Sequence, residues 1–221
     1  MTKSEVLQRV KEVCLVPVVR AKSAQQAVEL ARAIAAGGVT VMEMTMTVPD
    51  PLVAIRTLVK ENPELLIGAG TVIDPQMAEA CISEGAQFIV SPATNLDTIA
   101  LCRKHSIACL PGALTPTEIL TAWNAGADVV KVFPASAMGG AKYIKSLKAP
   151  LPQVDMIPTG GVSVATVAEF LDAGSYALGV GADLADAKAI EQGRAQDVTA
   201  SARRYMQAIA DYRSKKKSAA N

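Results

Sequence analysis

Along its whole length the chain alternates between two kinds of segment, and this alternation determines the expected fold class. Short runs rich in β-branched residues are followed by longer stretches rich in Ala, Glu, Lys and Gln, as in strands followed by helices. We expect eight strands, at residues 15–20, 39–46, 65–71, 88–92, 108–112, 129–133, 155–159 and 177–181. We expect helices between them, at residues 23–36, 51–61, 75–84, 95–105, 116–125, 141–147 and 164–173.

A glycine followed by a small residue and an apolar run recurs where four of these helices meet the next strand. The recurring glycines are Gly38, Gly85, Gly126 and Gly174, and they are 47, 41 and 48 residues apart. Each spacing is about two strand–helix units of an eightfold repeat. The pattern predicts an α/β protein with a single-domain (β/α)8 (TIM) barrel, and a doubly wound open sheet is the alternative.

The two ends of the chain lie outside this repeat. An extra helix at residues 3–13 is expected before the first strand, where it would close the bottom of the barrel. Residues 1–213 are expected to form the barrel domain, and residues 214–221, with three consecutive lysines, a flexible basic tail.

Charge and residue usage exclude several classes of function. The 22 Lys and Arg residues nearly balance the 21 Asp and Glu residues, so we expect no nucleic-acid partner. No apolar run of about 18 residues occurs, and the first residues do not resemble a signal peptide. We therefore expect no membrane partner and a cytoplasmic location. Four cysteines lack a CxxC pair and lie among apolar residues, as buried thiols in a reducing compartment do: Cys14, Cys81, Cys102 and Cys109.

Two charged residues interrupt strands that are otherwise apolar. Lys131 shares one face of its strand with Val129 and Phe133, so in a barrel it points inward. Loss of solvation disfavours the ammonium and leaves a fraction of the lysine neutral and nucleophilic toward a carbonyl. Glu43, with Val41 on its face, can act as a proton shuttle. The alternatives are a lysine that reaches water and a glutamate that only balances a structural cation.

Groups that can bind anions follow several of the strands. In a barrel these groups lie at the C-terminal ends of the strands, where active sites are found. Arg20 follows the first strand and suits a substrate carboxylate, although it can instead pair with a nearby acid. Thr71 ends the third strand after two glycines. Glycine-rich turns after strands seven and eight contain Gly160, Gly161 and Gly181, and their backbone amides can face a phosphate. His105 is the only histidine, so a His-rich metal site is excluded.

Six short motifs, in order along nearly the whole chain, resemble those of the class I 2-keto-3-deoxy-6-phosphogluconate (KDPG) and 4-hydroxy-2-oxoglutarate (KHG) aldolase family. They are Val-Met-Glu43-Met-Thr, Gly68-Ala-Gly-Thr71-Val, Ser91-Pro92, Pro111-Gly112, Val-Lys131-Val-Phe-Pro134-Ala and Pro158-Thr-Gly-Gly161-Val. Together they are specific, whereas any one of them alone is weak.

The resemblance implies a Schiff-base mechanism. Lys131 would form the imine with the C2 ketone, and Glu43 would move protons. Cleavage between C3 and C4 would give pyruvate and glyceraldehyde 3-phosphate, a step of the Entner–Doudoroff pathway. The protonated imine accepts the electrons, so the resemblance implies no metal and no organic cofactor. It also implies a homotrimer.

The resemblance also assigns the residues that would bind the substrate. Thr71 and an arginine would contact the pyruvate carboxylate, and Phe133 and Pro92 would lie beside the imine. The substrate-phosphate residues would be Gly160, Gly161, Gly181 and the residue after Gly181, Ala182.

Two positions depart from many relatives. Thr47 stands where some have an arginine, a charge that Arg20 supplies in another branch of the family, and Ala182 replaces a serine. The substrate therefore remains open between KDPG, its galactonate epimer, KHG and another 2-keto-3-deoxy acid. A barrel isomerase or synthase with an electrostatic Lys131, and a small-anion binding protein, are the other hypotheses.

Overall fold

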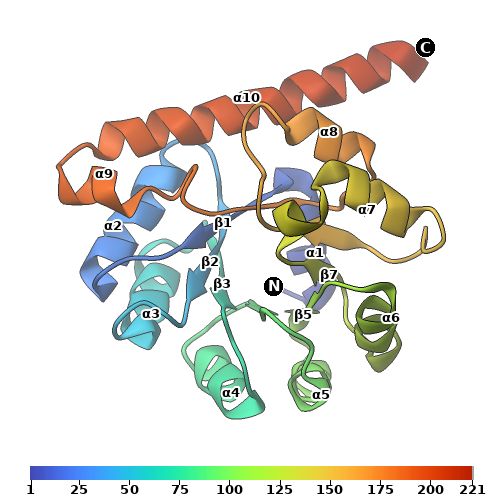
Figure 1. The fold of residues 1–221 in the computed structure, drawn as a ribbon. Coiled ribbons are helices and arrows are strands. Elements are labelled where there is room, and N and C mark those ends of the chain that lie inside the picture. The colour runs from blue at the N-terminus through green and yellow to red at the C-terminus, as the bar shows by residue number, and fades with distance from the viewer. Residues whose placement is uncertain (221) are drawn as a thin grey trace.

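The computed structural model describes residues 1–220 and contains the expected alternation of strands and helices (Figure 1). The strands are β1 (Leu15–Val19), β2 (Val41–Thr45), β3 (Leu66–Gly70), β4 (Phe88–Val90), β5 (Ala108–Leu110), β6 (Gly112–Ala113), β7 (Val130–Val132), β8 (Met156–Pro158) and β9 (Leu178–Val180). The helices are α1 (Lys3–Val13), α2 (Ala24–Ala35), α3 (Pro51–Glu61), α4 (Pro75–Ser83), α5 (Leu96–Lys104), α6 (Pro116–Ala125), the 3-10 helix η1 (Ala135–Met138), α7 (Ala141–Lys148), α8 (Val167–Asp172), α9 (Ala187–Glu191) and α10 (Ala195–Ala220). Within residues 1–220, no helix combines the length and the apolar character that crossing a bilayer requires.

The strands form a parallel, curled sheet at the centre of the molecule, with helices around it (Figure 1). One sheet has the order β5-β4-β3-β2-β1-β9 and a second has the order β6-β7-β8. A bridge between Thr159 and Gly179 connects β8 to β9. The expected strand at 108–112 is observed as two, β5 and β6, because Pro111 lies between them and proline has no amide hydrogen for the ladder. The α/β fold class is confirmed.

Apolar side chains pack on both faces of the curled sheet. Val6 and Val10 of α1 belong to an inner cluster with Val41 and other residues at the N-terminal ends of the strands. Met42 and Met44 belong to a larger outer cluster between the strands and the helices. Val41 and its neighbours Met42 and Met44 therefore lie on opposite faces of β2, as alternation along a strand requires. Because α1 fills the inner face at the N-terminal ends, the opposite ends of the strands are left for chemistry.

Most of the expected helix starts are observed with a side-chain cap. Four residues accept a hydrogen bond from a backbone amide of the first helical turn: Ser23, Asp74, Asn95 and Thr115. The start expected at Pro51 is confirmed as well, with a proline in the first turn of α3, although Asp50 has φ 51° and makes no side-chain cap bond. The start expected at residue 164 is wrong, because α8 begins only at Val167.

The sequence predicted no helix after residue 173, but the structure contains α9 and α10 there. Helix α10 continues through the predicted flexible tail as far as Ala220, so residues 214–220 are helical. An ion pair of 2.7 Å between Lys216 Nζ and Asp172 Oδ1 of α8 attaches this last part of α10 to the rest of the molecule. The last residue of the predicted tail, Asn221, lies outside the described residues. The domain boundary at residue 213 stays a prediction.

Candidate active site

The two charged residues predicted inside the barrel lie next to each other. Lys131 on β7 is 6% exposed and Glu43 on β2 is 2% exposed. The Lys131 Nζ atom is 3.3 Å from Glu43 Oε1. Because β2 and β7 are not neighbouring strands, the pair spans the inside of the curled sheet. Lys131 is buried rather than extended into solvent, which argues against the alternative of a lysine that reaches water.

A glycine on β3 makes room for the Glu43 carboxylate. A Cβ atom on Gly70 would lie 2.8 Å from both the carboxyl carbon and Oε1 of Glu43, closer than real Cβ contacts. The two glycines before Thr71 were assigned no role from the sequence, although a glycine inside an apolar strand is a usable signal of close approach. Thr71 follows directly, is half-buried, and has φ 60°, which is uncommon for a residue with a side chain.

An aromatic ring covers the lysine on one side. The centre of the Phe133 ring is 5.5 Å from Lys131 Nζ. Phe133 and Pro92 line a cavity of about 240 Å³, together with Gly112 and Leu114. The structure therefore brings together the two apolar residues that were expected beside the reacting carbon.

Arg20 lies at the mouth of the site rather than against Glu43. It is exposed, and its Nη1 atom is 3.9 Å from the position that a Cβ atom on Gly181 would occupy. The alternative in which Arg20 pairs with Glu43 is not what the structure shows, because Glu43 pairs with Lys131. Thr47, at the position of the missing arginine, is exposed and has its Oγ1 2.8 Å from Thr45 Oγ1.

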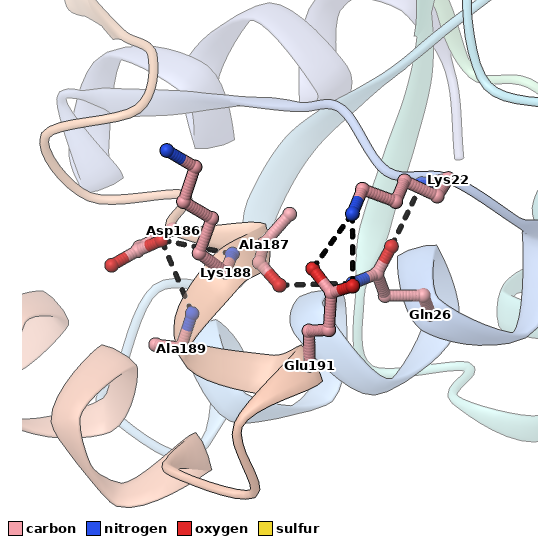
Figure 2. Close-up of polar contacts among 7 residues, drawn as sticks. All are labelled: Lys22, Gln26, Asp186, Ala187, Lys188, Ala189 and Glu191. Carbon is pink, nitrogen blue, oxygen red and sulfur yellow. Dashed lines mark hydrogen bonds and ion pairs between the residues drawn. The ribbon is translucent and has the colours of Figure 1, made fainter.

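Polar contacts fix the loop that carries Arg20 to the segment after β9 (Figure 2). Lys22 Nζ lies 2.8 and 2.9 Å from the two carboxylate oxygens of Glu191 on α9. The Gln26 side chain accepts from the Lys22 backbone amide at 2.7 Å and donates to the Ala187 carbonyl at 2.9 Å. The ends of β1 and β9 are therefore held at a defined separation beside the site.

The two glycine-rich turns lie side by side, because the bridge between Thr159 and Gly179 precedes both of them. Gly160 and Gly161 have φ values of 102° and 78°, which only glycine adopts readily. In the described part of the chain, the amides of Gly161 and Ala182 donate to no protein acceptor. These amides are available to an anion.

Sequence reasoning missed one neighbour of these turns and left the role of another open. Ser136 of η1 places its Oγ 3.2 Å from the position of a Cβ on Gly160, and no motif pointed to it. Asp183, the other neighbour, follows Ala182 and accepts a hydrogen bond from Tyr205. Asp186, three residues later, caps α9 by accepting from the Lys188 and Ala189 amides at 2.9 and 3.2 Å (Figure 2).

The cysteines and the histidine lie away from these groups. All four cysteines are buried and free, as predicted, and burial raises the pKa of Cys81 to about 12, which keeps that thiol protonated. His105 ends α5, with Nε2 3.2 Å from Glu79 Oε2. Residues 1–220 contain no group of three or more His, Cys, Asp and Glu side chains placed to hold a metal ion.

Comparisons with known proteins agree on one family. The profile of the KDPG and KHG aldolase family matches residues 6–201. A KHG/KDPG aldolase of Escherichia coli K12 is 36% identical over 189 residues, 86% of this chain and 89% of that protein. A 2-dehydro-3-deoxy-phosphogluconate aldolase of Treponema pallidum is 35% identical over 205 residues, 93% of this chain and 96% of that protein. Among solved structures, this chain is similar to a KDPG aldolase of Legionella pneumophila, with a TM-score of 0.83 and 29% sequence identity. The similarity covers 92% of this chain and 97% of that chain. The Legionella structure contains pyruvate captured at low pH as a covalent carbinolamine intermediate.

Proposed function

The chain belongs to the KDPG and KHG aldolase family, a family of lyases, and from this premise we propose that it is a Schiff-base aldolase that cleaves KDPG to pyruvate and glyceraldehyde 3-phosphate. The observation that carries the proposal is the buried pair of Lys131 and Glu43, 3.3 Å apart. A primary amine and a carboxylate that share a water-poor site are the two groups that imine chemistry needs.

This geometry supports the following reaction. Lys131 passes a proton to Glu43 across their 3.3 Å contact, and its neutral amine attacks the C2 ketone. Glu43 then returns that proton, with which the carbinolamine hydroxyl leaves as water. Glu43 then takes the proton of the C4 hydroxyl as the C3–C4 bond breaks, which releases the aldehyde. The bonding electrons move into the iminium and form an enamine. Protonation at C3 and addition of water to the imine release pyruvate and regenerate the lysine.

Substrate binding is proposed for the remaining predicted residues. Thr71 and Arg20 bind the carboxylate, while Pro92 and Phe133 shield the imine carbon from water. The turn residues, which bind the phosphate through backbone amides, are Gly160, Gly161, Gly181 and Ala182.

A second candidate is an aldolase for a related 2-keto-3-deoxy acid, either the galactonate epimer of KDPG or KHG. Two observations keep it open. Ala182 offers no hydroxyl at the phosphate turn, which favours the unphosphorylated KHG, and Thr47 is bonded to Thr45 at the position where some relatives carry an arginine. A comparison of kcat/KM on the three substrates separates these candidates.

We also propose that the strands close into a complete (β/α)8 barrel, in which β5 and β6 act as one strand. Two hydrogen bonds support closure. The Lys131 amide donates to the Pro111 carbonyl at 2.9 Å, and the Tyr176 amide donates to the Met156 carbonyl at 2.8 Å. One domain over residues 1–213 and a cytoplasmic location are proposed from the sequence, and a homotrimer is proposed from the family resemblance. Light scattering on the purified protein tests the assembly.

Trapping of the imine tests the function. The protein is incubated with pyruvate and sodium borohydride, and its intact mass and peptide map are then measured. We expect one reduced pyruvate adduct, on Lys131, and no adduct in the folded Lys131→Ala variant. The variant Lys145→Ala, in which an exposed lysine of α7 is removed, serves as the control and should retain the adduct. A folded parent protein without an adduct would favour the isomerase or anion-binding hypothesis.

A further inference from the structure

A buried tyrosine of the C-terminal helix contacts both glycine turns. Tyr205 of α10 is 0% exposed. Its hydroxyl donates to Oδ2 of Asp183 and lies 3.4 Å from the carbonyl oxygen of Val162. Val162 directly follows Gly161, and Asp183 directly follows Ala182. One hydroxyl therefore reaches the residue after each of the two predicted phosphate-binding pairs.

The surroundings of this hydroxyl keep it a hydrogen-bond donor. Burial, and then the neighbouring Asp183 carboxylate, raise the pKa of Tyr205 far above its ordinary value, so it stays protonated at all physiological pH values. Its bond to Asp183 holds that carboxylate oxygen against α10, where its charge is compensated by a donor. The Ser201 hydroxyl adds a longer contact of 3.5 Å to the Asp183 carbonyl.

At the turn after β9, Ala182 can offer an anion only its backbone amide, because its side chain has no donor. A backbone amide points at a ligand only when the conformation of its loop is fixed. The amides of Gly161 and Ala182 are free to bind an anion, but they lie on separate loops, after β8 and after β9. A single group that contacts both loops sets the separation of the two amides.

We propose that Tyr205 is a positioning residue that fixes the two glycine turns so that their amides converge on the phosphate of the substrate. This inference rests on the proposed function, because it takes the turns to be the phosphate site. It goes further by assigning phosphate selectivity to a side chain that does not touch the substrate.

The test is the variant Tyr205→Phe, which removes one oxygen atom and keeps the buried ring. We expect KM for KDPG to rise about 5- to 20-fold while kcat changes less than about twofold. For 2-keto-3-deoxygluconate, the same keto acid without the phosphate, both constants should stay near the parent values. The pyruvate adduct formed with borohydride should also be unchanged, which shows that the variant is folded.

A second tyrosine of the same helix provides the matched control. Tyr212 donates to Asp172 Oδ1 at 3.1 Å, so Tyr212→Phe removes the same kind of bond between α10 and an aspartate, but away from the turns. It should show parent constants on both substrates.

Two results would overturn the role of Tyr205. One is an unchanged KM for KDPG in Tyr205→Phe, and the other is an equal rise in KM for the phosphorylated and unphosphorylated acids, which would indicate a merely structural residue. If the parent protein itself formed no pyruvate adduct, the proposed function would fail instead, so the two failures are distinguishable.

Discussion

The two ends of the proposed site differ in the groups that would bind the substrate. The pyruvate end, formed by Lys131, Glu43, Thr71 and Phe133, relies on side chains that project from strands or their ends. The phosphate end, formed by Gly160, Gly161, Gly181 and Ala182, relies on backbone amides in loops. Side chains on strands are positioned by the sheet itself, whereas amides in loops need support from elsewhere in the chain. Changes at the first end should therefore affect the chemistry, and changes at the second should affect affinity.

The largest effect that we expect from a conservative change at the pyruvate end is that of Glu43→Gln. The amide keeps the shape of the side chain but cannot shuttle protons, so kcat should fall about 10²- to 10⁴-fold. KM for the keto acid should change much less, since a proton shuttle acts mainly in transition states. Steady-state kinetics on KDPG measure both constants.

The matched control for this variant is Glu169→Gln. Glu169 is an exposed residue of α8 and lies outside the cavity beside Phe133. Its kcat should stay within about twofold of the parent value, as for most surface substitutions. Equal kcat values for parent and Glu43→Gln would remove Glu43 from the mechanism.

The contrast between the two ends also explains how much of the molecule could be predicted from its sequence. Lys131 and Glu43 stood out because a charge inside an apolar strand is expensive, and that cost is visible in residue types alone. The alternation of strands and helices was equally visible, because packing against a core imposes it.

Other features were not predictable, for physical reasons that differ from case to case. One expected strand is split at Pro111, because proline lacks the amide hydrogen that the ladder needs there. The sequence shows the proline but not whether its amide position faces a neighbouring strand. The helical state of residues 214–220 is accompanied by a long-range contact, that of Lys216 with Asp172, which the sequence does not show. Tyr205 lies on a buried helical face with Val198 and Ile209, and that spacing predicts burial but not which loops the hydroxyl reaches.

Arg20→Ala tests which end the arginine serves. If Arg20 binds the carboxylate, the variant should capture pyruvate more weakly, and KM for KDPG should rise about tenfold or more through loss of a charge-assisted hydrogen bond. Two quantities are measured. The yield of borohydride adduct at limiting pyruvate reports pyruvate capture, and KM reports binding of KDPG.

Arg20 also lies near Gly181, so Arg20→Ala can instead weaken phosphate binding. Weaker binding of KDPG with unchanged pyruvate capture would assign Arg20 to the phosphate end. Lys22→Ala is the control, because Lys22 lies on the same loop and pairs with Glu191. An effect as large in Lys22→Ala as in Arg20→Ala would mean that the loop, and not the guanidinium, is responsible.

The smallest effect, and the sharpest test of a phosphate end made of backbone, is expected for Ala182→Ser. The new hydroxyl supplies one donor beside the Ala182 amide, in an exposed turn that has room for it. One further hydrogen bond to a charged group should lower KM for KDPG about 3- to 10-fold and leave kcat unchanged. Parallel kinetics on 2-keto-3-deoxygluconate should show no gain.

Ala165→Ser is the matched control, since Ala165 is also an exposed turn residue but lies outside the proposed site. An unchanged KM for KDPG in Ala182→Ser, with the parent active, would place the phosphate away from the turn after β9.

Combining Ala182→Ser with Tyr205→Phe tests whether the two residues act together. If Tyr205 sets the position of that turn, the gain from the serine hydroxyl should shrink in the double variant, because the hydroxyl no longer points reliably at the phosphate. Full additivity of the two changes would mean that the hydroxyl binds independently of the loop support.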